Sequence, residues 1–222
     1  CKVWYFPQVF DVESCPNPIN VAYSDVALGL HTDLAYYESP PGLQLLHCLR
    51  HVSLPPHNTL YDSCVIGGES YLVDAWHVAE QMRSQHPREF AALARIPATF
   101  QKIHLQRYNL VPCFQFYFLR IIHYHGNVIG INWSPPFEGP LSIKEEDIEP
   151  YFEAYHLFAT LLESSDVQLE KQLEEGEMIS FNNRRVLHAR RQFNLNGGVR
   201  HLQVRLCGSL SHLVMNPSFH CM

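Results

Sequence analysis

The chain has 222 residues, of which 46% are hydrophobic and 17% are charged, and its formal net charge is −6 at pH 7 with histidine neutral. This length suits one domain with a sizeable hydrophobic core, and the negative charge gives no electrostatic case for nucleic-acid binding. No apolar run is long enough to cross a bilayer, because the most apolar region, 110–122, is short and contains Pro112 and Arg120.

The seven cysteines form no Cys-x-x-Cys pair, so we expect free thiols in a reducing compartment. We expect the cytoplasm first and the mitochondrion as the alternative. The chain begins at Cys1 rather than Met, without a signal-peptide pattern, so we expect a fragment of a longer protein.

Hydrophobic patterning predicts many short strands and two helical inserts. The strands are expected over 43–50, 69–74, 128–133, 177–181, 185–189 and 199–206. Asp74 is expected to cap a helix over 75–84, a second helix starts at Pro87, and 148–162 has the apolar spacing of a longer helix. The pattern is typical of a mainly β protein, a β-sandwich or jelly roll with helices packed outside.

The candidate chemistry centres on His31-Thr32-Asp33. If this stretch is a strand, residues i and i+2 point to one face, so one metal ion can take both the imidazole and the carboxylate. The best candidate for a third ligand is His188. Two histidines and one carboxylate, with other positions open, are the arrangement of non-haem Fe(II) oxygenases. Alone, the motif is a weak signal, because most of the 14 histidines will be core or surface residues.

Arg190, Arg191 and Arg200 follow His188 within twelve residues. A 2-oxo acid that chelates iron carries a second carboxylate, and a guanidinium can hold it bidentately. Arg200 lies one hairpin strand later, flanked by Val199 and Leu202, and is expected in that role. We interpret Arg190 and Arg191 as solvated charge.

Several segments together resemble a known family, in the same order across residues 9–203. They are Asn20-Val-Ala-Tyr23, His31-Thr-Asp33, Pro40-Pro-Gly-Leu-Gln-Leu-Leu-His-Cys48, Gly67-Gly-Glu-Ser70, Phe181-Asn-Asn-Arg-Arg-Val-Leu-His188 and Arg200-His-Leu202. The combination resembles the γ-butyrobetaine dioxygenase family, which includes trimethyllysine dioxygenase and belongs to the TauD/TfdA-like Fe(II)/2-oxoglutarate oxygenases.

The resemblance implies a single oxygenase domain over 1–222, with a double-stranded β-helix (jelly-roll) core and flanking helices. It implies His31, Asp33 and His188 as catalytic Fe(II) ligands, Arg200 as the 2-oxoglutarate anchor, and ascorbate as an optional reductant. Ser70 matches a position near the co-substrate; the alternative is a strand-edge hydroxyl bonded to backbone.

The implied reaction is the hydroxylation by O₂ of a small metabolite, first γ-butyrobetaine in carnitine biosynthesis, with trimethyllysine as the near alternative. The implied substrate-binding residues are Asn20, Tyr23, Phe6 and Phe10, the last two as part of an aromatic cage for a trimethylammonium group. The alternatives are a core aromatic for Tyr23 and an apolar N-terminal flap for the phenylalanines. Neither nucleic acid nor a membrane is an expected partner, and the oligomeric state, a homodimer included, stays open.

The chain also departs from the family pattern. No Tyr or Trp follows Tyr155, so Leu206 falls near the position of a family cage tyrosine, and Ser134-Pro135-Pro136 replaces an Asn-containing loop. Segments 53–65 and 109–118 look like insertions, and the resemblance stops near Val204, as translated non-coding sequence would produce. A catalytically inert jelly-roll binding domain and a cupin-like metal-binding protein are therefore competing interpretations.

Overall fold

The computed structural model describes residues 9–14, 21–52, 65–103, 113–117, 119–121, 126–164, 166, 168–195 and 198–208. The predictions for Phe6 and Asn20, and those for 53–64 and 209–222, lie outside these residues.

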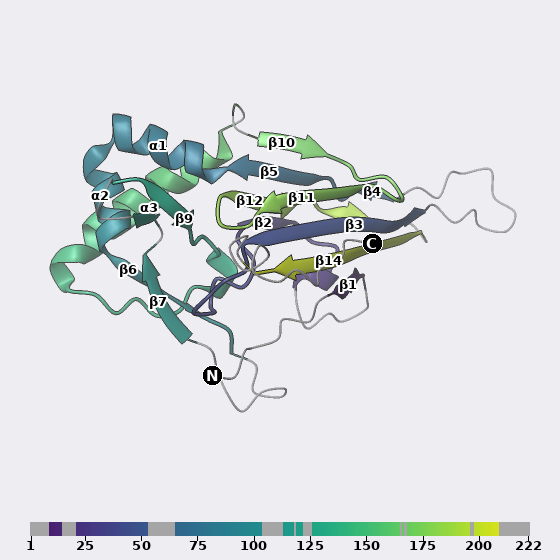
Figure 1. Cartoon of the computed structure of the whole chain (residues 1–222), viewed down its shortest axis with the longest axis horizontal. Helices are drawn as coiled ribbons and strands as arrows, with labels where there is room; N and C mark the ends of the chain where they lie inside the picture. The colour runs from purple at the N-terminus through teal and green to yellow at the C-terminus, as the bar shows by residue number, and fades with distance from the viewer. Residues whose placement is uncertain are drawn as a thin grey trace, which may run out of the picture.

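Two four-stranded antiparallel sheets form the larger part of the described chain (Figure 1). The first has the order β1-β14-β3-β11 and the second has the order β10-β5-β12-β2. The first sheet consists of β1 (Phe10–Glu13), β14 (Val199–Cys207), β3 (Leu43–Val52) and β11 (Met178–Asn182). The second consists of β10 (Gln168–Lys171), β5 (Ser70–Asp74), β12 (Val186–Arg190) and β2 (Leu28–His31).

Three two-stranded sheets complete the β structure of the described residues. They pair β13 (Phe193–Asn194) with β4 (Ile66–Gly67), β6 (Pro97–Gln101) with β7 (Cys113–Tyr117), and β8 (Leu119–Ile121) with β9 (Val128–Ile131).

The two large sheets pack face to face through one hydrophobic cluster. Leu46 on β3 and Leu202 on β14 belong to it, and Leu72 on β5 and Val186 on β12 pack against it from the second sheet. The opposite face of the second sheet, with Val73 and other apolar side chains, packs against the helices in a larger cluster. The second sheet is therefore covered on both faces.

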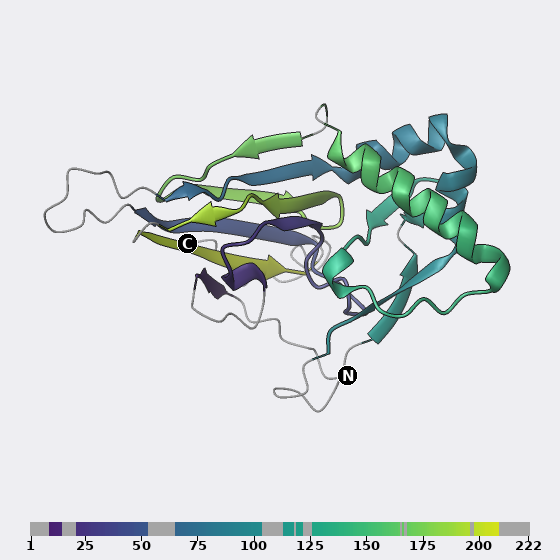
Figure 2. The same ribbon diagram turned by 180° about the vertical axis from the view of Figure 1, so that it is seen from behind.

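The helices α1 (Ala75–Gln85), α2 (Pro87–Arg95) and α3 (Ile148–Glu163) gather with β6, β7 and β9 at one end of the molecule (Figure 2). The backbone N–H of His77 donates to Oδ1 of Asp74 at 3.2 Å, which confirms the predicted cap of α1. Short 3₁₀ helices are η1 (Val21–Tyr23), η2 (Pro135–Phe137) and η3 (Glu145–Asp147). No helix in the described part of the chain is long and apolar enough to span a membrane.

The predicted strands and helices are confirmed to within a few residues, and the fold is mainly antiparallel β with helices. One prediction about the candidate motif is wrong. Strand β2 ends at His31, and Asp33 lies in the following turn, so the alternation of a strand does not place its side chain.

The resemblance to the family was expected to stop near Val204. Strand β14 continues to Cys207, and both Val204 and Leu206 are buried in the cluster between the sheets. Part of the supposed insertion at 109–118 forms β7, which pairs with β6 in regular antiparallel register. These residues are therefore integral to the fold.

Candidate metal centre

Two histidines face each other from neighbouring strands of the second sheet. His31, the last residue of β2, is the register partner of His188 on β12, and their ring centroids are 4.2 Å apart. Both side chains are buried. The pairing of β2 with β12 thus joins two imidazoles that are 157 positions apart in the sequence.

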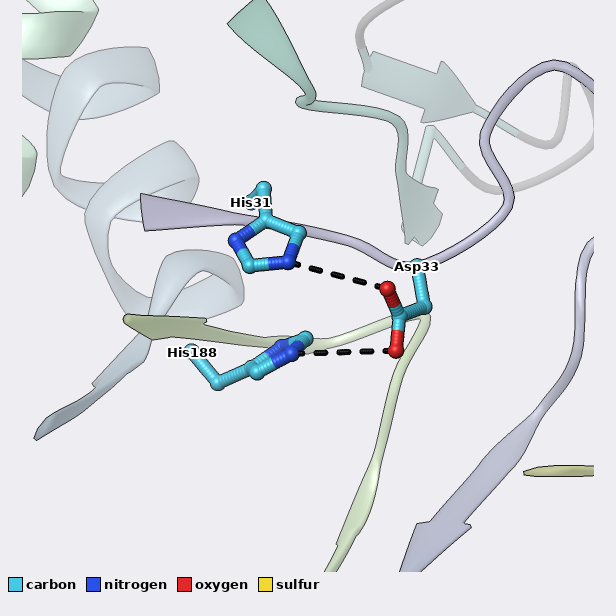
Figure 3. Close-up of side chains that lie close together, drawn as sticks. All are labelled: His31, Asp33 and His188. Atoms are coloured by element: carbon cyan, nitrogen blue, oxygen red, sulfur yellow. Dashed lines mark ion pairs between the residues drawn. The ribbon is translucent and has the colours of Figure 1, made fainter. Parts of the chain in front are cut away.

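Asp33 completes the cluster from the turn after β2, as Figure 3 shows. Its Oδ1 lies 3.6 Å from Nε2 of His31, and its Oδ2 lies 3.8 Å from Nε2 of His188. One ligand atom from each of the three residues lies within 4.8 Å of the others. Within the described ranges this is the one group of three or more His, Cys, Asp or Glu side chains with such spacing.

The protonation states suit metal ligation. Burial and the charge of His31 lower the pKa of His188 to about 3, so that imidazole is neutral at neutral pH. Burial raises the pKa of Asp33, but the neighbouring imidazoles of His31 and His188 and the hydrogen bond from Gln44 outweigh it and bring the pKa to about 2. Nδ1 of His31 lies 2.8 Å from the carbonyl oxygen of Gly29 and donates to it, and Nε2 faces Asp33.

Two residues that the sequence analysis did not identify contact Asp33. Nε2 of the fully buried Gln44 donates to Oδ2 of Asp33 at 2.7 Å, and the Asn183 side chain bonds the backbone of Asp33. A glutamine inside the otherwise apolar start of a predicted strand was the available signal for Gln44. Nothing in the sequence distinguished Asn183 from the other polar residues of its turn.

Arg200 is a buried cation on β14. Nη2 donates to the carbonyl oxygen of Gly68 at 3.2 Å, Nε has no hydrogen-bond partner, and no carboxylate of the described residues forms an ion pair with it. Burial and the charge of Arg190 lower its pKa to about 10, so it stays charged at neutral pH. Gly68, at φ +82°, leaves room for this side chain, since a Cβ there would lie 3.0 Å from Nε of Arg200. The buried charge is suited to an anionic ligand.

The interpretation of Arg190 and Arg191 as solvated charge holds for Arg191 and is wrong for Arg190. Arg191 is half-exposed and pairs with Glu170 at 2.8 Å. Arg190 is buried, and its guanidinium donates to the carbonyl oxygens of Ala22, Ser24 and Val26 at 2.6–2.9 Å. Three backbone carbonyls that converge on one point replace water as its partners.

Three other predicted site residues, Ser70, Tyr23 and Phe10, lie in the described part of the chain outside the His31–Asp33–His188 cluster. Ser70 is buried on β5, and its register partner is Arg190, two positions beyond His188 on the same face of the sheet. Tyr23 is half-buried in η1, within the segment that Arg190 holds. Phe10 packs against the cluster between the sheets from β1. No hydrogen bond or ion pair joins any of these three to the His31–Asp33–His188 cluster.

The cluster combines two imidazoles and one carboxylate between two antiparallel sheets, which is the donor set typical of a class of mononuclear non-haem metal proteins. Residues 4–206 match the family described as "Taurine catabolism dioxygenase TauD, TfdA family", and the chain belongs to this family.

Three proteins that are similar in sequence to this chain are named as dioxygenases. The chain is 37% identical over 197 residues to "Dioxygenase str8" of Strobilurus tenacellus, covering 86% of the chain and 41% of that protein. It is 31% identical over 198 residues to "Gamma-butyrobetaine dioxygenase" of Pseudomonas sp. strain AK-1, covering 89% and 48%. It is 26% identical over 220 residues to "Trimethyllysine dioxygenase, mitochondrial" of Mus musculus, covering 93% and 44%. The chain thus spans less than half the length of these relatives.

Among solved structures, the fold is similar to that of the non-haem iron oxygenase OrfP in complex with Fe and alpha-ketoglutaric acid. The TM-score is 0.63 at 16% identity, and the match covers 95% of this chain and 60% of that one. At this identity the likeness concerns the fold.

Proposed function

We propose that this chain is the catalytic domain of an Fe(II)- and 2-oxoglutarate-dependent oxygenase that hydroxylates a small molecule. The observation that carries the proposal is the convergence of His31, Asp33 and His188 within 4.8 Å, with both imidazoles buried. Membership of the TauD/TfdA family supports it.

The residues present fit the two groups that this chemistry needs. Two imidazoles and one carboxylate are the donor set of a ferrous ion whose remaining positions stay open. The uncompensated guanidinium of Arg200 fits the distal carboxylate of 2-oxoglutarate. Bound iron would supply the activation of O₂, coupled to decarboxylation of the co-substrate. We also propose that the two face-to-face sheets are the double-stranded β-helix of the family.

In this proposal, the chain's own side chains orient the metal ligands, bind the co-substrate and exclude water. The carbonyl oxygen of Gly29 orients the His31 imidazole through Nδ1, and burial keeps the His188 imidazole neutral. Arg200 orients the co-substrate by charge, and the apolar cluster between the sheets keeps water from the reacting centre. Ser70, on the face that carries His188, is our candidate for a further contact with the co-substrate.

For the substrate we propose γ-butyrobetaine or a related betaine, with trimethyllysine as the second candidate. The relatives named for these two substrates support this choice, and Tyr23 and Phe10, with Asn20 and Phe6, are the proposed contacts. Leu206 is buried between the sheets, where the family pattern has a cage tyrosine, so Leu206 supplies no aromatic face. We therefore expect weaker discrimination for the trimethylammonium group than a full cage would give.

The test measures succinate release by the purified chain with Fe(II), 2-oxoglutarate, ascorbate and O₂, with and without γ-butyrobetaine, trimethyllysine and related betaines. We expect release that depends on both iron and 2-oxoglutarate and that rises with the preferred substrate. A chain that binds neither Co(II) nor 2-oxoglutarate would contradict the proposal and favour an inert jelly-roll domain.

A further inference from the structure

Gln44 is a neutral side chain that reaches from one sheet to the ligands of the other. It lies on β3 in the first sheet and is fully buried. Its Nε2 lies 2.7 Å from Oδ2 of Asp33 and 3.3 Å from Nε2 of His188. Two of the three proposed metal ligands therefore meet the same amide nitrogen.

Chemistry fixes which way this amide points. An ionised carboxylate only accepts hydrogen bonds, so the NH₂ group of Gln44 must face Asp33. The amide oxygen then points away, and Oε1 is buried without a hydrogen-bond partner. A buried unsatisfied acceptor costs stability, and an apolar side chain of the same size would avoid that cost. Packing alone therefore does not account for a glutamine here.

The two oxygens of Asp33 have different surroundings. Oδ2 accepts the hydrogen bond from Gln44, whereas Oδ1 is turned toward Nε2 of His31 at 3.6 Å without such a donor. A carboxylate oxygen held by a strong donor is a poorer ligand than its free neighbour, and outer contacts of this kind orient the ligands of metal sites.

We infer that Gln44 is a positioning residue that holds Oδ2 of Asp33, so that the carboxylate binds the metal through Oδ1 alone. This inference rests on the proposed function. A carboxylate that binds with one oxygen leaves free the coordination position that its second oxygen would occupy, and the co-substrate needs that position. Gln44, which lies on the first sheet, thus affects how many protein atoms coordinate a metal bound at the second sheet.

The experiment compares wild type with Gln44→Met, which keeps the length of the side chain and removes the donor. The matched control is Gln203→Met, because Nε2 of Gln203 also donates to a carboxylate, Oδ1 of Asp11 at 3.2 Å, on the exposed edge of the first sheet. Co(II) serves as the probe metal. Titration gives its affinity, its visible spectrum reports the coordination number, and a second titration gives the 2-oxoglutarate affinity of the Co(II)-loaded protein.

We expect Gln44→Met to weaken Co(II) binding by about 10- to 100-fold. We also expect the Co(II)-loaded variant to bind 2-oxoglutarate more weakly and its visible spectrum to indicate one more protein ligand on Co(II). Gln203→Met should match wild type in all three measurements. Equal affinities and spectra in Gln44→Met and wild type would overturn the inference and leave the proposed function intact. Failure of wild type to bind Co(II) would instead contradict the proposed function. If Gln44→Met does not fold, Gln44→Asn keeps the amide but withdraws it by one methylene, and the same outcomes apply.

Discussion

Asp33 and Asn183 hold each other through two hydrogen bonds of opposite direction. The backbone N–H of Asp33 donates to Oδ1 of Asn183 at 2.9 Å, and Nδ2 of Asn183 donates to the carbonyl oxygen of Asp33 at 3.1 Å. The same Nδ2 lies 3.1 Å from the carbonyl oxygen of Pro41, and the side chain is fully buried. Asn183 precedes β12, so one side chain ties the turn of Asp33 to the start of the strand that carries His188.

Replacing Asn183 with leucine is therefore expected to damage both stability and metal binding. The substitution leaves the N–H of Asp33 and two carbonyl oxygens without partners, at a cost of about 3 kcal/mol in the free energy of unfolding. It also frees the turn that positions the carboxylate. Urea unfolding of the metal-free protein and titration with Co(II) measure the two effects. Asn194→Leu, at an exposed position on β13, is the control, and equal results for both variants would refute the role of Asn183.

Replacement of a proposed metal ligand should abolish both metal binding and turnover. His31→Ala and Asp33→Ala each leave two of three donors, so we expect Co(II) and Fe(II) binding to fall below detection and turnover to disappear. His77→Ala changes an exposed histidine on α1 and should retain both. Unchanged turnover in either ligand variant would refute the assignment, and calorimetric titration together with succinate release decides it.

The proposed positioning of a 2-oxo acid by Arg200 can be tested separately from metal binding. Arg200→Ala removes a charge-assisted contact with the co-substrate, worth about 1.5–3 kcal/mol, and should raise the 2-oxoglutarate requirement by about 10- to 100-fold. Co(II) affinity without 2-oxoglutarate should stay at the wild-type value. Arg205→Ala, on the same strand with its side chain on the opposite face, serves as the control. Wild-type dependence on 2-oxoglutarate in Arg200→Ala would contradict its role.

The sequence named the candidate ligands but not the contacts that hold them in place. His31, Asp33 and His188 were identifiable because their residue types and the open-site requirement suffice to name candidates. The geometry that joins them depends on the pairing of β2 with β12 and on a turn at Asp33, which the alternation of a strand does not describe. The predicted strands and helices followed from hydrophobic periodicity, and the pairing order did not, because register depends on contacts between distant segments.

The residues that sequence analysis missed share one property. Arg190 donates to carbonyl oxygens more than 160 positions earlier in the chain. Gln44 contacts Asp33 from the other large sheet, and Asn183 contacts it from the turn before β12. Their functions reside in tertiary contacts with backbone or with another side chain. In sequence they are an arginine beside another arginine, a glutamine in an apolar strand and an asparagine in a turn, and only the glutamine differs from what a solvated position would show.

Arg190 offers a test of how the segment with Tyr23 is held. Arg190→Met removes the donors to three carbonyl oxygens and should lower the free energy of unfolding by about 3 kcal/mol. It should also speed amide hydrogen exchange in residues 22–26, because their carbonyls lose a common anchor. Arg191→Met, which removes only a half-exposed ion pair, should change stability by less than about 1 kcal/mol. Wild-type exchange of 22–26 in Arg190→Met would show that this segment is held by other contacts.

The carboxyl group of Glu138, which lies outside the candidate metal centre, should make the stability of the protein depend on pH. Burial raises the pKa of Glu138 from 4.5 to about 7, although the hydroxyl of Tyr155 donates to its Oε1 at 3.2 Å and opposes this shift. A raised carboxyl pKa means that the folded chain holds a proton that the unfolded chain releases, so the contribution of Glu138 is most favourable below pH 4.5 and is lost as the pH rises to about 7.

Glu138→Gln should remove this loss, because the amide stays neutral at every pH. Relative to wild type, the variant should gain free energy of unfolding between pH 5 and pH 8. We expect a gain of about 1 kcal/mol, since partial exposure of Glu138 reduces the value that the full shift would give. Urea unfolding of both proteins across this range measures the difference. Glu153→Gln, an exposed carboxylate on α3, should follow the wild-type curve, and a Glu138→Gln curve parallel to wild type would show that the carboxylate is charged in the folded protein throughout.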